Sequence, residues 1–138
     1  MSVELSLKEM IEKGKERRSR IVQELFKLYD RVQELERDPL EELIEKGKEK
    51  RARIAQELFK LYEKEAELEA ELYKEAAEIL RHIDKDDFIA RISAADDGLE
   101  FWTRRKRKVS MIFIGKDGSV AVQARNGTYL IGQRIVLL

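Results

Sequence analysis

The sequence predicts an α+β protein, in which a long antiparallel helical hairpin is followed by a small antiparallel β-sheet or barrel-like module. Two observations carry this prediction. An internal repeat with helical spacing fills the first part of the chain, and short alternating segments separated by Asp-Gly and Asn-Gly turns fill the last part. We therefore expect a helical hairpin over residues 1–85 and a β module over residues 86–138.

The internal repeat is the strongest single feature. Residues 11–29 return as residues 44–62, which places the copies 44 − 11 = 33 positions apart, and the run Gln-Glu-Leu-Phe-Lys-Leu-Tyr is identical in both. Ser6 with Glu9 reads as a capping box, and Asp38 before Pro39 reads as a second helix start. These signals predict one helix that ends near residue 36 and another that runs to about Ile83.

Apolar residues in both predicted helices recur at three- and four-residue spacing, as in the seam of a coiled coil. Folding the chain at residues 37 and 38 would relate the copies by an approximate two-fold axis. It would also give each mid-helix glycine a leucine neighbour, which offsets a cost of about 1 kcal/mol per glycine. One kinked rod is the alternative. The pairs expected in the hairpin are Gly14 with Leu61, Gly47 with Leu28, Arg18 with Glu57 and Arg51 with Glu24.

Each copy carries a second apolar stripe outside the seam. Because two helices cannot cover both stripes, we expect the β module, another copy of the chain or a partner to pack there. The stripes are Val22, Phe26 and Tyr29 in the first copy, and Ala55, Phe59 and Tyr62 in the second. They predict self-association, with a dimer favoured.

Alternating residues after Asp87 predict a meander of four or five strands. The turns between them are indicated by Asp96-Asp97-Gly98, by Lys116-Asp117-Gly118 and by Asn126-Gly127. The strands are expected at residues 88–93, 99–104, 109–114, 119–125 and 128–138.

A basic and aromatic run in the β module is the sharpest functional signal. Five consecutive cations follow two aromatic residues, and this combination is typical of surfaces that bind phosphates and stack bases. Cations on an edge strand also prevent sheets from aggregating, so edge protection is the competing interpretation. The candidate nucleic-acid-binding residues are Trp102, Arg104, Arg105, Lys106, Arg107 and Lys108.

Composition narrows the remaining classes of function. The chain has no cysteine and one histidine, His82, so we expect no thiolate or transition-metal site, no cofactor and no catalytic centre. No apolar run is long enough to span a membrane, and we expect a cytoplasmic protein without a small-molecule substrate. Charged residues make up 41% of the chain, which is typical of thermostable proteins and of designed ones.

Charge is unevenly distributed along the chain. Residues 1–86 carry 19 basic and 23 acidic side chains, a balance of −4, whereas residues 87–138 carry 9 and 5, a balance of +4. The sequence thus predicts a non-enzymatic structural or interaction module that self-associates through helical stripes. Its near-perfect repeat and idealised caps are equally typical of a designed protein. A nucleic-acid-binding protein that uses residues 101–108 is the alternative.

Overall fold

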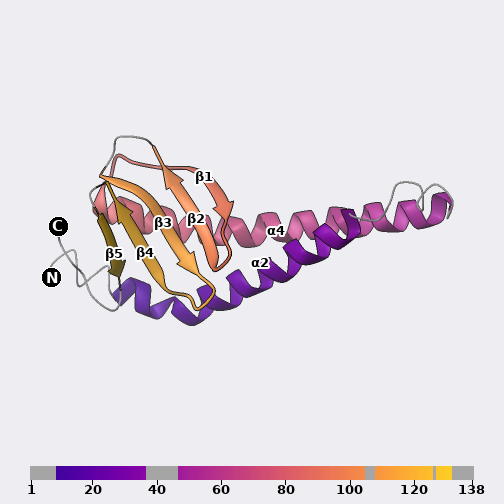
Figure 1. Cartoon of the computed structure of the whole chain (residues 1–138), viewed down its shortest axis with the longest axis horizontal. Coiled ribbons are helices and arrows are strands. Elements are labelled where there is room, and N and C mark those ends of the chain that lie inside the picture. Colours follow the sequence, from indigo (N-terminus) through magenta and orange to yellow (C-terminus); the bar gives the residue numbers. More distant parts are fainter. Residues whose placement is uncertain (1–8, 37–46, 105–107, 126, 132–138) are drawn as a thin grey trace. The chain divides into compact units, whose positions relative to one another are not determined.

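The computed structural model describes residues 9–36, 47–104, 108–125 and 127–131, with the backbone alone over residues 128–131 (Figure 1). Residues 9–13 are helical, and helices α2 (Lys15–Glu36) and α4 (Lys48–Ile83) follow. The strands are β1 (Ile89–Ala94), β2 (Gly98–Thr103), β3 (Val109–Gly115), β4 (Val120–Ala124) and β5 (Gly127–Ile131). The predicted α+β class is confirmed.

The five strands form one antiparallel sheet in the order β1-β2-β3-β4-β5, a meander in which neighbours in sequence are neighbours in space (Figure 1). The strand ranges agree with the prediction to within one or two residues, except that β5 is described only to Ile131. β1 and β5 stand at opposite ends of this order. Barrel closure, which the sequence left open, is therefore not seen in the described residues.

The chain divides into two compact units. Unit 1 combines Met1–Gln23 with Glu71–Leu138, and unit 2 is Glu24–Ala70. Each of the two long helices contributes to both units. The predicted boundary between residues 85 and 86 separates segments that are expected to fold independently. The two units do not test that boundary, so it stays a prediction.

Unit 1 has an apolar core with one charged residue inside it. Residues of β2, β3 and β4 on one face of the sheet are fully buried, as are several residues of the two helices. Arg18 is buried with them and is only 1% exposed. The buried apolar residues of this unit include Ile11, Ile21, Val22, Leu72, Ala76, Ile79, Leu80, Leu99, Phe101, Ile112, Ile114, Val120 and Val122.

Arg18 joins three parts of unit 1. Its guanidinium donates to the carbonyl of Ile11 and, at 3.0 Å, to the carbonyl of Gly118, and it lies 3.9 Å from a carboxylate oxygen of Glu75. Burial lowers the pKa of Arg18, while Glu75 opposes this shift. A buried cation is costly unless it is paired and hydrogen-bonded. These acceptors explain how the core tolerates it.

The turn between β3 and β4 lies against the start of α2. Gly118 has φ +82°, and a Cβ on it would fall 1.9 Å from the carbonyl oxygen of Lys15. Ser19 Oγ and Gln23 Nε2 both donate to the carbonyl of Lys116, at 2.6 and 3.2 Å. Glycine is required here because only a residue without a side chain permits both the backbone angle and the contact.

Unit 2 contains parts of α2 and α4, and its contacts correct the predicted register. Tyr29 of α2 donates to Glu69 of α4, and Tyr62 of α4 donates to Glu36 of α2. The paired numbers sum to 29 + 69 = 62 + 36 = 98, whereas folding at residues 37 and 38 required a sum near 75. The α4 partner of a given α2 residue is therefore displaced by 98 − 75 = 23 positions, about six helical turns.

The predicted pairing of Arg18 with Glu57 is wrong. Glu57 instead binds Arg31 at 2.9 Å, and Arg18 makes its contacts within unit 1.

The two glycines of the repeat do not lie in helix interiors, contrary to prediction. Gly47 has φ +85° and immediately precedes α4. Gly14 forms a turn before α2, where an added Cβ would lie 2.3 Å from Arg18 Nη1. Gly14 thus makes room for an arginine rather than a leucine. The predicted helix starts at Ser6 and Asp38 lie outside the described residues.

Candidate functional site

The first stripe is largely used inside the fold. Val22 is fully buried, and Phe26 and Tyr29 are half-buried, with their rings edge to face at 5.9 Å. The Tyr29 hydroxyl donates to Glu69 at 2.5 Å. Burial, together with the Glu69 carboxylate, raises the pKa of Tyr29.

The second stripe is exposed although its sequence is almost the same. Phe59 is 65% exposed, Tyr62 is 44% exposed, and Ala55 is exposed as well. The hydroxyl of Tyr62 donates to Glu36, which raises the pKa of Tyr62. The tip of this tyrosine is thus fixed while much of its ring faces solvent. Four large apolar side chains of the described residues are exposed, and two of them, Phe59 and Tyr62, lie one turn apart on this stripe, which makes it a candidate contact surface.

The exposed stripe is longer than the sequence analysis recognised. Further exposed alanines continue it in both directions at three- and four-residue spacing, and sequence reasoning missed them because alanine gives a weak apolar signal. We call the full set the α4 row. Its members, all exposed and all in unit 2, are Ala52, Ala55, Phe59, Tyr62, Ala66 and Ala70.

The two tyrosine contacts are related by the repeat. Tyr29 and Tyr62 are 33 positions apart, and so are their acceptors, Glu36 and Glu69. The same residue type therefore meets the same partner type in each direction between α2 and α4. The hydrogen bonds are thus reciprocal, but burial is not. Phe26 and Tyr29 are half-buried, whereas Phe59 and Tyr62 are exposed.

The second candidate site, the basic and aromatic run, is only partly described. Trp102 is half-buried on β2, where its indole donates to Ser93 Oγ at 3.2 Å and the guanidinium of Arg91 lies 5.0 Å from its ring centroid. Lys108 is exposed. Arg105, Lys106 and Arg107 lie outside the described residues.

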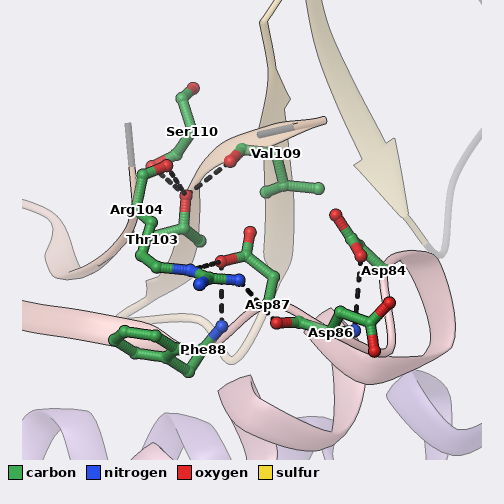
Figure 2. A network of polar contacts seen from close by, with 8 residues as sticks. All are labelled: Asp84, Asp86, Asp87, Phe88, Thr103, Arg104, Val109 and Ser110. Carbon is green, nitrogen blue, oxygen red and sulfur yellow. Dashed lines mark hydrogen bonds and ion pairs between the residues drawn. The ribbon is translucent and has the colours of Figure 1, made fainter. Parts of the chain in front are cut away.

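Arg104 is held by groups of its own chain, as Figure 2 shows. Its Nε donates to Asp87 Oδ1 at 3.3 Å, its Nη2 donates to the carbonyl of Asp86 at 2.5 Å, and its guanidinium lies 4.5 Å from the ring centroid of Phe88. The Asp87 side chain is fully buried and also accepts the backbone N–H of Phe88 at 2.8 Å. Arg104 therefore joins the end of β2 to the start of β1, and its charge is paired within the chain.

Thr103 extends this cluster toward β3. Its hydroxyl contacts the carbonyls of Val109 and Ser110, and the latter oxygen is 3.1 Å away (Figure 2). A hydroxyl has one proton to donate, so the two carbonyls share or alternate it. These contacts join the end of β2 to the start of β3.

Comparisons with known proteins add no assignment: a scan against protein-family models and searches of curated proteins and of solved structures each found no match. Among the residues that the structure describes, no group of three or more His, Cys, Asp or Glu side chains is arranged to hold a metal ion. No helix in the same part of the chain is both long and apolar enough to cross a bilayer.

Proposed function

We propose that this protein is a non-enzymatic structural or interaction module that self-associates through the α4 row. The observation that carries the proposal is the exposure of Phe59 and Tyr62, at 65% and 44%, in the middle of that row. Complete burial of one such ring is worth about 1.5–3 kcal/mol. A dimer that covers the row on both chains would bury the exposed part of four such rings.

The spacing of the row fits another helix. Three- and four-residue steps place all its members on one side of α4, as in the seam of a coiled coil. The four alanines allow two helices to approach closely, and the two rings fill the space between them. A second copy of the same chain carries a matching row on its own α4, so we propose that copy as the occupant.

Charges beside the row favour an antiparallel pair. Lys60 and Glu63, both exposed, each follow a ring in sequence. When Phe59 lies opposite Tyr62 of an antiparallel second copy, each Lys60 comes near a Glu63 of the other chain. In a parallel pair each flank of one helix faces the other flank of its partner, so Lys60 and Glu63 would not meet.

The arrangement inside unit 2 belongs to the same proposal. We infer a coiled-coil-like antiparallel hairpin of α2 and α4 with approximate two-fold symmetry. The reciprocal contacts of Tyr29 with Glu69 and of Tyr62 with Glu36 support it. Such a hairpin buries one side of α4 against α2 and leaves the exposed α4 row for a second molecule.

Sedimentation equilibrium over a wide range of protein concentration tests self-association. The wild type should reach twice the monomer mass. The variant Ala55→Gln/Phe59→Gln should remain monomeric, because it places polar groups in the row. Lys64→Gln/Glu67→Gln is the matched control, since it introduces two glutamines at exposed positions of the same helix outside the row and leaves the net charge unchanged.

A wild type that stays monomeric near millimolar concentration would contradict the proposal. Equal dimerisation of the row variant and the wild type would also contradict it. Circular dichroism of each variant shows whether the helices remain folded, so a loss of association cannot be confused with a loss of structure.

A further inference from the structure

The two faces of the sheet differ in their exposure. On one face, six residues of β2, β3 and β4 are each 1% exposed or less. They are Leu99, Phe101, Ile112, Ile114, Val120 and Val122. Side chains alternate between faces along a strand, so the residues between these belong to the other face. We call that second face the open face.

The open face carries large apolar side chains in a position where polar ones are usual. Trp102 of β2 pairs directly with Met111 of β3, and Phe113 of β3 pairs with Ala121 of β4. All four are neither buried nor fully exposed. Phe113 also pairs with Glu100 of β2, and Ser93 Oγ donates to the Glu100 carboxylate at 2.9 Å. Two aromatic rings and a thioether are thus displayed over the two neighbouring strands β2 and β3.

One end of the open face is basic. The backbone N–H of Arg125 donates to the carbonyl of Lys108 at 3.1 Å, which places these two exposed residues side by side at the ends of β4 and β3. Arg91, also exposed, lies against the ring of Trp102. Acidic groups near this end are Asp87, which is paired with Arg104, and the exposed Asp86. Arg91, Lys108 and Arg125 together leave this end positive.

We propose that the open face binds single-stranded nucleic acid. Trp102 and Phe113 stack on unpaired bases, and Lys108 and Arg125 contact phosphates. Stacking needs bases that are free of a duplex, and every base has a ring face to offer, so binding is to single strands with little sequence preference. Exposed cations beside the rings favour this polyanion over an apolar protein partner.

This site differs from the basic run that the sequence nominated, because it adds Arg91, Met111, Phe113 and Arg125 and does not use Arg104. It goes beyond self-association and does not depend on it. All of its residues lie in unit 1, whereas the α4 row lies in unit 2. Either property can be lost without the other.

Trp102 is the sole tryptophan of the chain, so its fluorescence reports on the site directly. Titration with a single-stranded oligothymidylate at low salt should quench Trp102 emission. Phe113→Leu should weaken the affinity about tenfold, since it removes one stacking ring but keeps an apolar residue in the strand. Tyr73→Leu is the matched control, because Tyr73 is an exposed aromatic residue of α4 outside the face, and it should bind as the wild type does.

The charge contribution is measured separately through the salt dependence. Lys108→Ala/Arg125→Ala should reduce the slope of log affinity against log salt by about 0.7 for each phosphate that the variant no longer neutralises. Lys74→Ala/Arg81→Ala removes the same two charges from exposed positions of α4 and should leave the slope unchanged. Circular dichroism confirms that each variant is folded.

Three results would overturn the proposal. The first is the absence of quenching at low salt. The second is equal affinity of Phe113→Leu and the wild type, which would mean that the ring takes no part. The third is equal binding of duplex DNA or heparin, which would reduce the surface to a general polyanion site or indicate an acidic protein partner.

Discussion

Arg18 and Arg51 occupy the same position in the two copies of the repeat but have different surroundings. Arg18 is 1% exposed and holds the carbonyls of Ile11 and Gly118, whereas Arg51 is half-exposed. Arg18→Ala should therefore lower the free energy of unfolding by about 3 kcal/mol, because it leaves the carbonyls of Ile11 and Gly118 without their donor and removes a cation from beside Glu75. Urea denaturation measures this change.

The matched control is Arg51→Ala, for which we expect a loss of less than about 1 kcal/mol. Equal losses at the two positions would contradict the distinct role of Arg18. The slope of the urea transition should stay the same in both variants, which shows that the comparison concerns stability and not the extent of unfolding.

Asp117 provides a test based on pH. Hydrogen bonds from the hydroxyl and backbone N–H of Ser119, at 2.6 and 2.9 Å, lower the pKa of Asp117 from its ordinary value of 3.8. A depressed carboxyl pKa stabilises the fold above the ordinary value, and this stabilisation is lost as the pH falls through the folded pKa. Ser119→Ala should raise the pKa of Asp117, as NMR titration of its carboxyl carbon would show. An unchanged titration would mean that the Ser119 hydroxyl is not a partner in solution.

At the scale of elements, Phe26 in α2 and Phe59 in α4 form a natural matched pair within identical local sequence. Phe26→Ala removes a half-buried ring packed edge to face on Tyr29, so we expect it to lower the free energy of unfolding by about 1–3 kcal/mol. Phe59→Ala should change it by less than about 0.5 kcal/mol in dilute, monomeric protein. Thermal or urea unfolding of both variants decides the question, and similar losses would contradict the exposure assigned to Phe59.

The strands and the ends of the helices could be predicted because they depend on neighbours in sequence. Asp-Gly turns and alternation located β1 to β4, and the helix ends at Glu36 and Ile83 agree with their signals. The register of α2 on α4 could not be predicted in this way. A three- and four-residue pattern repeats every seven positions, so it matches itself after a shift of one or several heptads. The choice among those registers depends on contacts such as Tyr29 with Glu69, which are distant in sequence.

The candidate surfaces were only partly predictable for a similar reason. Composition singled out Trp102 and the cations beside it, but not the contact of Arg104 with Asp87 across 17 positions. The open face could have been found by alternation, since Trp102, Met111 and Phe113 all oppose buried neighbours in their strands. The sequence alone did not reveal the register of β2 on β3 that brings these residues together. Likewise, the nearly identical sequences of the two copies of the repeat did not indicate that one stripe would be largely buried and the other exposed.

For the whole molecule, self-association should make thermal stability depend on protein concentration. A partner that binds only the folded state stabilises it by mass action, by about 2.7 kcal/mol when the free partner is at 100 times its dissociation constant. Scanning calorimetry should therefore give a Tm that rises with concentration for the wild type and for Lys64→Gln/Glu67→Gln. The Tm of Ala55→Gln/Phe59→Gln should stay constant, and a rise of the same size would refute the role of the α4 row.

The buried contact between Arg18 and Gly118 spans 100 positions of a 138-residue chain. During synthesis, the arginine leaves the ribosome long before the turn that accepts its hydrogen bond exists. Contacts of such long range form late, because the intervening chain must first be ordered. The N-terminal residues of unit 1 therefore cannot complete their contacts until translation is almost complete. Until then, Arg18 lacks the carbonyl of Gly118 as an acceptor. Any nascent chain that stops before the β3–β4 turn exposes the helical core of unit 1, which makes truncated products of this protein natural targets for chaperones and proteases.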